Sequence, residues 1–339
     1  MSRRAYSQQI LAVFALMVAL LLPDMAMATV TIKLATLAPE GSTWHKGLRQ
    51  MADEWSEITH GEVEVKIYAG GVVGNETVML RKMRIGQLHG GAVTNSAFLE
   101  IEPSAQVIQT PMLIRDNDEL DYVMTTMGPE FERRIEANGF KVLNWGDAGW
   151  VHMFTKTPLT QSSHVGDHKM FAWEGDPAAV EMYRKGGFRP VVIAVTDMMP
   201  SLQSGMIDAF PATPLTALAF QWFALAPNMM DLPWAPLMGA TILTDDAWAM
   251  IPAQYHDALL ASARRTGEGI KGQVRSQDTK AVEVMKKYGL TVNHVDDAER
   301  ALWISGAEAT YPIVREKMVP PEIFDQTKAL VEQYRAAHP

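Results

Sequence analysis

The sequence predicts an α/β fold of two domains with doubly wound, mainly parallel sheets, and three observations support this. The 339 residues correspond to about two domains. Hydrophobic residues make up 47% and charged residues 20% of the chain, which is typical of a globular protein with a large core. Stretches in which every second residue is apolar alternate with stretches of helical period along the chain. Such alternation is typical of parallel sheets covered by helices.

The first domain opens with a β-α-β-α-β pattern. Alternating apolar residues predict strands at 30–34 and 63–67, and a short apolar run predicts a buried strand at 91–94. Between them, apolar residues three and four apart predict a helix at 43–59, and Asn75 is a suitable N-cap for a second helix that ends near residue 89. After Pro103 we expect an apolar stretch at 107–114, two helices separated at Gly128-Pro129 and a strand at 140–145.

The second domain repeats the pattern. We expect strands at 151–155, 170–173, 191–195 and 207–210, with helices at 177–185, 198–203 and 215–223. A strand at 239–243 returns to the first unit, long helices follow at 252–287 and 298–318, and the tail is helical. The predicted domains are residues 29–150 plus about 240–285, residues 151–239 plus about 286–318, and a C-terminal helical tail at 319–339. A cleft between two such domains is the natural place for a ligand.

The first 28 residues have the features of a signal peptide. Arg3 and Arg4 precede an uninterrupted apolar run at residues 10–22, and Ala26-Met27-Ala28 matches a cleavage site. A membrane anchor needs about 20 apolar residues, and Pro23 and Asp24 end this run too early. The sequence therefore predicts export to the periplasm with cleavage after Ala28. The pair Arg3-Arg4 after Ser2 leaves open whether export uses the general or the twin-arginine route.

Composition and motifs exclude several classes of function. The formal net charge of −9 argues against nucleic acid as a partner. The chain has no cysteine, which excludes disulfides, thiolate metal sites and cysteine nucleophiles. His164 and His168 are spaced for a shared metal on a helix, but Ser162, Ser163 and Gly166 indicate a loop. No nucleotide, zinc or nucleophile-elbow motif is present, so we expect no enzyme activity, no metal and no cofactor.

Several motifs identify a family resemblance. The stretches at 33–42 (KLATLAPEGS), 70–74 (GGVVG), 84–87 (RIGQ) and 202–208 (LQSGMID) resemble, in matching order, the DctP family of TRAP transporter solute-binding subunits. The resemblance implies a periplasmic binding protein fold with two domains that close on a solute. It also implies delivery of the solute to membrane permease subunits, driven by an ion gradient without ATP hydrolysis.

Two positions depart from the family pattern. Family members usually bind an organic acid through arginines, but the matching positions hold Val151 and Phe171. The usual Glu-Asn-Pro is also replaced in the stretch 208–214 (DAFPATP). Each charge-assisted hydrogen bond contributes about 1.5–3 kcal/mol. The loss of two arginines therefore weakens carboxylate binding by about 10²–10⁴.

These changes predict a cleft for a hydrophobic or amphipathic ligand, such as a fatty-acid-like molecule. The aromatic residues at or beside family cleft positions are Trp150, Phe171, Trp173, Phe210 and Trp234, although packing between the domains would also explain aromatic side chains there. Further candidates for ligand binding are Val151, Ala212, Asn95, Ser96, Asp197, Leu37, Glu40 and Trp44. Of these, Asn95 and Ser96 follow the third strand and could cap a loop instead, and Asp197 could cap a helix.

Two alternatives concern the ligand and the partner. A carboxylate ligand remains possible if its cationic anchor has moved to another residue, for which Arg49, Arg81 and Lys156 are the candidates. The segment 211–237 resembles arginine-less family members that associate with a tetratricopeptide-repeat protein in the periplasm. Such a repeat protein is therefore a predicted partner beside the permease.

Overall fold

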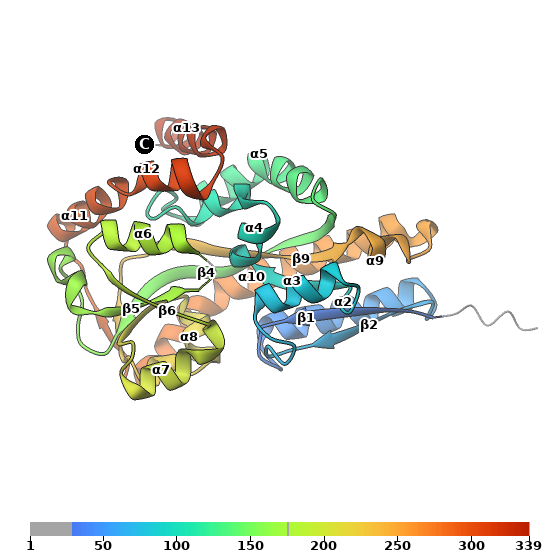
Figure 1. The fold of residues 1–339 in the computed structure, drawn as a ribbon, viewed down its shortest axis with the longest axis horizontal. Coiled ribbons are helices and arrows are strands. Elements are labelled where there is room, and N and C mark those ends of the chain that lie inside the picture. The colour runs from blue at the N-terminus through green and yellow to red at the C-terminus, as the bar shows by residue number, and fades with distance from the viewer. Residues whose placement is uncertain (1–28, 175, 339) are drawn as a thin grey trace, which may run out of the picture.

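The computed structural model describes residues 29–174 and 176–338, which form a mixed α/β fold of two lobes (Figure 1). One ten-stranded sheet runs through both lobes in the order β2-β1-β3-β9-β4-β7-β5-β6, with β8 on β4 and β10 on β8. The strands are β1 Val30–Thr36, β2 Val63–Tyr68, β3 Gly90–Thr94, β4 Phe140–Thr155, β5 Lys169–Trp173, β6 Arg189–Ile193, β7 Ala209–Ala212, β8 Asn228–Met230, β9 Ala235–Thr244 and β10 Thr291–Asn293. The predicted α/β fold class is confirmed.

Each lobe has a parallel group of strands, and two long antiparallel strands connect the groups. Strand β1 pairs in parallel with β2 and β3, and β5 pairs in parallel with β6 and β7. Strands β4 and β9 pair with each other along most of their length. The strands predicted separately at 140–145 and 151–155 are therefore one strand, because irregularities at Val142/Asn144 and Asp147/Gly149 bend β4 without ending it. Gly149 has a φ of 99°, which favours glycine.

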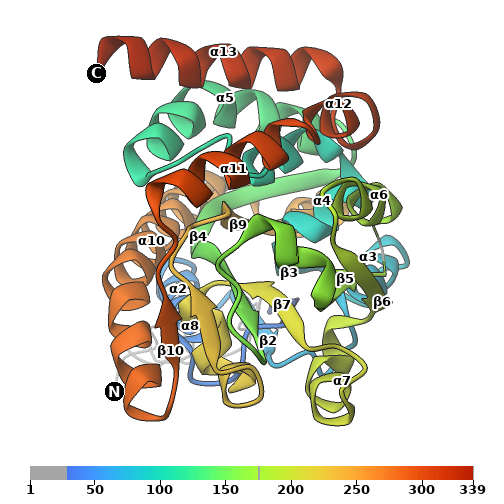
Figure 2. The ribbon, with the colours of Figure 1, turned by 90° about the vertical axis from the view of Figure 1, so that its left-hand side faces the viewer.

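Helices cover the sheet on both faces, and the C-terminal helix α13 lies over α5 (Figures 1 and 2). The α-helices are α2 Thr43–Ile58, α3 Glu76–Arg84, α4 Asn95–Ile101, α5 Asn117–Glu136, α6 Pro177–Lys185, α7 Met198–Ser204, α8 Pro214–Ala219, α9 Asp245–Ala249, α10 His256–Lys287, α11 Asp297–Glu308, α12 Tyr311–Ile313 and α13 Pro321–Ala337. Shorter turns are η1 Pro103–Gln109, η2 Ser162–Asp167, η3 Val195–Asp197, η4 Trp222–Ala224, η5 Ala253–Tyr255 and the π-helical η6 Val314–Met318.

Prolines behave differently from the prediction in two helices. The predicted break at Gly128-Pro129 is wrong, because α5 continues through Pro129. Buried apolar residues on both sides of this proline, among them Val123 and Phe131, hold the helix against the sheet. The predicted helix at 298–318 is instead divided into α11, α12 and η6. Pro312 has no N–H to continue the hydrogen-bond ladder of α11, which explains the division.

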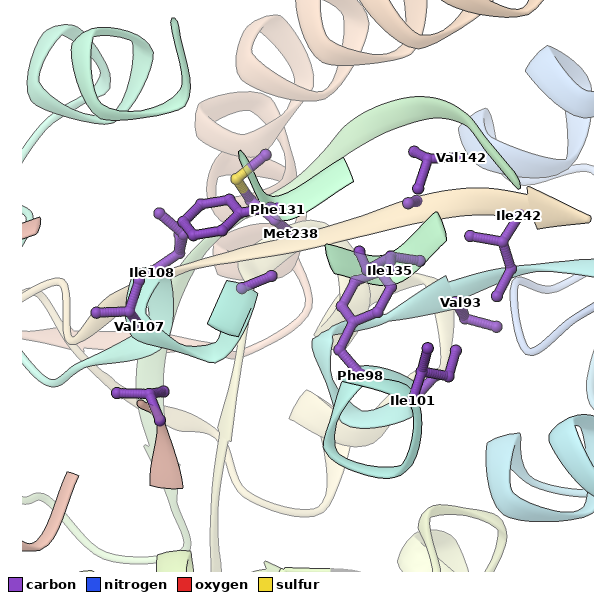
Figure 3. Close-up of a cluster of buried hydrophobic side chains, with 14 of the residues drawn as sticks. Val93, Phe98, Ile101, Val107, Ile108, Phe131, Ile135, Val142, Met238 and Ile242 are labelled. Atoms are coloured by element: carbon purple, nitrogen blue, oxygen red, sulfur yellow. The ribbon is translucent and has the colours of Figure 1, made fainter. Parts of the chain in front are cut away.

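The largest core lies between the first lobe's part of the sheet and helices α4, η1 and α5 (Figure 3). Val93 of β3 and Ile242 of β9 lie beside Phe98 of α4 and Ile135 of α5. At the other end of this core, Phe131 of α5 lies beside Met238 of β9 and Ile108 of η1. Phe98 and Phe131 are completely buried. This core fixes the positions of β3, α4 and η1, all of which reach the cavity described below.

Three continuous elements connect the lobes. Helix α10 contacts α2 of the first lobe and α8 of the second, and it also packs along β4. The domain boundaries predicted near residues 150, 240 and 285 lie inside β4, β9 and α10, respectively. The division into domains at these residues stays a prediction.

The close packing of α10 on β4 depends on Gly267. A Cβ atom at this position would lie 2.5 Å from the Trp145 carbonyl oxygen and 2.8 Å from Asn144 Cβ. We expect Gly267→Ala to lower the free energy of unfolding by about 1–3 kcal/mol. Gly272→Ala in the same helix is the control, because a Cβ there meets nothing within 4 Å, and it should be neutral or stabilising by up to about 1 kcal/mol. Urea unfolding of the two variants compares them, and equal stability would contradict the packing described here.

No helix within residues 29–174 and 176–338 is long and apolar enough to cross a membrane. The predicted signal peptide at residues 1–28 lies outside the described residues.

Candidate ligand-binding cavity

A cavity of about 360 Å³ lies where the two lobes meet. The first lobe contributes the ends of β1 and β3 and parts of α2, α4 and η1. The second lobe contributes β5, α6, β7 and α8, and the long strands β4 and β9 supply residues from both. At its edge Asn75 Nδ2 donates to Glu174 Oε1 at 3.0 Å, and this bond joins the start of α3 to the end of β5. Cavities of this size bind small molecules.

The wall of the cavity is mostly apolar. Large side chains on it include Trp44, Phe171, Tyr183, Trp234 and Leu237. Among the described residues, no lysine, arginine or histidine lines the cavity. Three carboxylic acids do line it, and their surroundings differ.

Glu76 lies at the start of α3 and is 3% exposed. Its Oε1 accepts from the Thr94 backbone N–H at 2.8 Å, and its Oε2 accepts from Thr94 Oγ1 at 3.0 Å. Burial raises the pKa of Glu76 to about 7, despite these hydrogen bonds. The Glu76 carboxyl group is therefore partly protonated at neutral pH.

Asp147 lies on β4 and is ion-paired on the side away from the ligand space. Its Oδ2 accepts from Arg275 Nε at 2.7 Å, and the other guanidinium nitrogens of Arg275 bind both carboxylate oxygens of Asp121 at 2.7 Å. Burial raises the pKa of Asp147, and the Arg275 guanidinium opposes that rise. Arg275 is absent from the cavity lining, so it neutralises Asp147 without offering a cation to the ligand.

Asp176 is the N-cap of α6, and its Oδ1 accepts from the Ala179 N–H at 2.8 Å. Burial raises the pKa of Asp176, against the backbone hydrogen bonds that it accepts. Of the three acids, Asp147 alone forms an ion pair among the described residues, while Glu76 and Asp176 have only hydrogen-bond donors as partners. Within the described part of the chain, the cavity wall therefore carries acidic groups and no cation.

Eight of the residues predicted from the sequence line this cavity. They are Leu37, Trp44, Ser96, Val151, Phe171, Trp173, Ala212 and Trp234. Val151 and Phe171, which replace the expected arginines, both form part of the apolar wall. Trp44 is held in place by a hydrogen bond from its Nε1 to the Asp147 carbonyl at 3.1 Å.

Four predicted residues lie elsewhere. Glu40 is exposed and lies in an outer surface groove with Arg49. Trp150 donates through Nε1 to Asn117 Oδ1 at 3.0 Å and packs on the first lobe's core. Phe210 is completely buried and stacks on Phe154 at 5.2 Å. Asp197 is exposed and makes no side-chain capping bond to α7.

Asn95 begins α4 directly after β3, but its side chain is outside the described part of the structure.

The proposed cationic anchors do not line the cavity either. Arg49 and Arg81 are exposed on α2 and α3. Lys156 donates through Nζ to the Leu202 carbonyl at 2.6 Å in the second lobe. None of the three cations named from the sequence is therefore placed to bind a carboxylate in this cavity.

Sequence reasoning missed one end of the cavity. Gln109 and Thr110 reach it from the end of η1, Tyr183 from α6, and Val314 and Met318 from η6. These residues come from helices, whose apolar pattern reports burial but not proximity to a ligand. No group of histidine, aspartate and glutamate within the described residues could hold a metal ion. His168 is buried, with its Nδ1 3.6 Å from Asp208 Oδ1.

A two-lobed α/β fold with a cavity between its lobes is suited to enclosing a small molecule. The family of bacterial extracellular solute-binding proteins, family 7 (DctP), matches residues 34–317. The chain belongs to this family, which confirms the resemblance seen in the sequence.

Two distant relatives each match most of the chain. A solute-binding protein of Verminephrobacter eiseniae is 22% identical over 92% of this chain and 90% of its own length. The C4-dicarboxylate-binding periplasmic protein of Rhodobacter capsulatus is 24% identical over 85% of this chain and 87% of its own. The fold is similar to that of a TRAP periplasmic solute-binding protein from Sulfurospirillum deleyianum with bound succinate. The comparison with that structure has a TM-score of 0.83 at 20% sequence identity, and it covers 90% of this chain and 100% of the Sulfurospirillum deleyianum chain.

Proposed function

We propose that this protein is the solute-binding subunit of a TRAP-type transporter and that its cavity binds an organic acid with a largely apolar body. The observation that carries the proposal is the lining of the cavity, which is mostly apolar and free of lysine, arginine and histidine among the described residues. Val151 and Phe171 stand in this wall where the family resemblance places arginines.

We infer the acid group of the ligand from the ligands named for its relatives. The protein from Rhodobacter capsulatus is named for C4-dicarboxylates, and the structure from Sulfurospirillum deleyianum contains succinate. These relatives favour the organic-acid alternative over a ligand that has no acid group. Since Arg49, Arg81 and Lys156 do not line the cavity, the acid is bound by neutral hydrogen-bond donors in this proposal.

We infer the apolar body of the ligand from the apolar wall of the cavity. Burial of about 200 Å² of apolar ligand surface contributes roughly 5 kcal/mol at about 25 cal/mol per Å². This contribution can offset the binding energy lost with two arginines, which we place at about 3–6 kcal/mol. A short, doubly charged acid such as succinate has little apolar surface and would leave this wall without a partner.

Calorimetric titration with octanoate and succinate tests the ligand class. We expect octanoate to bind and succinate to bind at least about 100-fold more weakly, since two charged groups would meet no cation. Tight binding of succinate without binding of octanoate would overturn the apolar part of the proposal. Binding of 1-octanol as tight as that of octanoate would overturn the acid part.

A variant that fills the cavity should abolish binding. Ala179 of α6 lines the cavity and is only half-buried, so a larger side chain can extend into the free space. We expect Ala179→Trp to lose octanoate binding and to keep the wild-type unfolding midpoint. Ala261→Trp, on the exposed face of α10, is the matched control and should bind normally. Unchanged octanoate affinity of Ala179→Trp would place the site elsewhere.

The cellular setting is part of the same proposal. The protein would act in the periplasm and pass its ligand to the membrane permease subunits of the transporter. The tetratricopeptide-repeat partner rests on the resemblance of segment 211–237, which runs from β7 to the start of β9. Cross-linking in the periplasm, followed by mass spectrometry of the cross-linked proteins, tests this partner. Recovery of permease subunits without any repeat protein would remove it from the proposal.

A further inference from the structure

The end of the cavity beside η6 contains a buried hydroxyl group without a partner. Thr110 follows η1, is 1% exposed and lines the cavity. Its Oγ1 has no hydrogen-bond partner among the described residues. A buried hydroxyl that makes no hydrogen bond destabilises the protein, and rotation about χ1 is enough to redirect the Oγ1 of a threonine. Once this rotation turns Oγ1 toward the cavity, a hydrogen-bond acceptor on the ligand would satisfy it.

Tyr183 supplies a second hydroxyl to the same cavity. It projects from α6, and its ring packs edge-on against Phe188 with a centroid distance of 5.4 Å. Within the described part of the chain, its hydroxyl makes no hydrogen bond that would compete with a ligand. Burial, and to a smaller extent the nearby charge of Asp176, raises the pKa of Tyr183, so the hydroxyl keeps its proton and remains a donor.

The elements that carry the two hydroxyls meet at the same turn. Turn η1, which Thr110 follows, and helix α6, which carries Tyr183, both contact η6. Val314 and Met318 of η6 line the cavity there. Gln109, directly before Thr110, lines it as well. Hydroxyl and amide groups therefore gather beside an otherwise apolar wall.

Hydrogen bonds to the three residues after Thr110 hold this segment in place. Tyr311 Oη donates to the Pro111 carbonyl at 3.1 Å, and the Met112 N–H donates to the Trp234 carbonyl at 2.7 Å. One residue further on, Arg335 of α13 donates to the Leu113 carbonyl at 2.8 Å. A donor on a segment fixed in this way needs little reorganisation when a ligand arrives.

We infer that Thr110 and Tyr183 donate hydrogen bonds to the carboxylate of the ligand at the η6 end of the cavity. The apolar body of the ligand then extends along Phe171 and Leu237 toward Trp44. The inference rests on the proposed function and deepens it, because it places the acid group on neutral donors. It also assigns the two residues that determine specificity for an acid.

Titration of isosteric variants with octanoate tests the inference. We expect Thr110→Val and Tyr183→Phe each to weaken octanoate binding by about 10- to 100-fold, the range for a hydrogen bond to a charged group. The effect on the weaker ligand 1-octanol, which has the same chain without a carboxylate, should stay within about threefold. Thr327→Val is the matched control, because Thr327 is also fully buried with an unpaired Oγ1 but belongs to α13 outside the cavity.

The outcomes separate this inference from the proposed function. If the wild-type protein binds octanoate and both Thr110→Val and Tyr183→Phe bind it equally well, the carboxylate lies elsewhere and only the inference fails. If the wild-type protein binds no monocarboxylate, the proposed function and the inference both fail. Circular dichroism of each variant verifies its fold, and the Tyr183→Phe result decides the question if Thr110→Val does not fold.

Discussion

Replacement of Glu76 by glutamine should make the protein progressively more stable than the wild type as the pH rises from 4.5 to 8. The carboxyl group has a pKa of 4.5 in the unfolded chain and about 7 in the folded protein. Between these values the folded protein holds a proton that the unfolded chain releases, so wild-type stability falls as the pH rises. The difference of about 2.5 pKa units corresponds to about 3 kcal/mol. Glu76→Gln lacks this titration and escapes the loss.

Unfolding by urea at several pH values measures this difference. The quantity to compare is the free energy of unfolding of Glu76→Gln minus that of the wild type, because a constant offset from altered hydrogen bonds to Thr94 then cancels. Glu64→Gln, at an exposed position on β2, controls for the loss of one carboxyl group from the chain. A Glu76→Gln difference that stays flat across this pH range would contradict the burial of the Glu76 carboxyl group without a cationic partner at the cavity wall.

Arg275→Met should destabilise the protein strongly, because it leaves Asp147 as an unpaired buried charge. The Asp147 side chain is 6% exposed and that of Arg275 is 22% exposed. Removal of one partner of a buried ion pair costs about 3–5 kcal/mol, and we expect a value near the lower limit because Arg275 is partly solvated. Guanidinium chloride unfolding at neutral pH measures the loss.

Lys271→Met is the matched control for this variant. Lys271 lies one turn earlier on α10 and also approaches Asp121, at 3.7 Å, but it makes no ion pair with Asp147. We expect it to change the stability by at most about 1 kcal/mol. The double variant Arg275→Met/Asp147→Asn should recover part of the loss, since it removes the buried charge as well. If Arg275→Met is no less stable than Lys271→Met, the ion pair with Arg275 does not compensate the buried charge of Asp147.

The sequence predicted those elements whose burial is one-sided. The predicted strand at 63–67 and helix at 43–59 agree with β2 and α2 within two residues. Helix α2 packs on β2, so each element buries one face and its apolar residues show a clear period. The prediction failed where tertiary packing overrides a local signal. Pro129 lies within α5, where buried neighbours hold the helix against the sheet.

The candidate site was predictable in part. Val151 and Phe171 were placed on the cavity wall by their positions in the family motifs, and the structure puts both there. Phe210 was misplaced because an aromatic residue in a short strand gives no indication of which face of the sheet it occupies. In the structure it stacks on Phe154, its partner on the neighbouring strand β4. Thr110 and Tyr183 were missed because hydroxyl groups in helical segments carry no signal for contact with a cavity. Only the packing of η1 and α6 on η6 brings them to one end.

Mass spectrometry of the ligand bound to the protein purified natively from the periplasm tests the central claim most directly. The protein should release, in stoichiometric amount, an organic acid with a long apolar portion. The cavity-filling variant Ala179→Trp, purified in parallel, should release none. A small hydrophilic acid recovered from the wild-type protein, or a neutral lipid without a carboxyl group, would contradict the claim that this cavity binds an amphipathic acid through neutral donors.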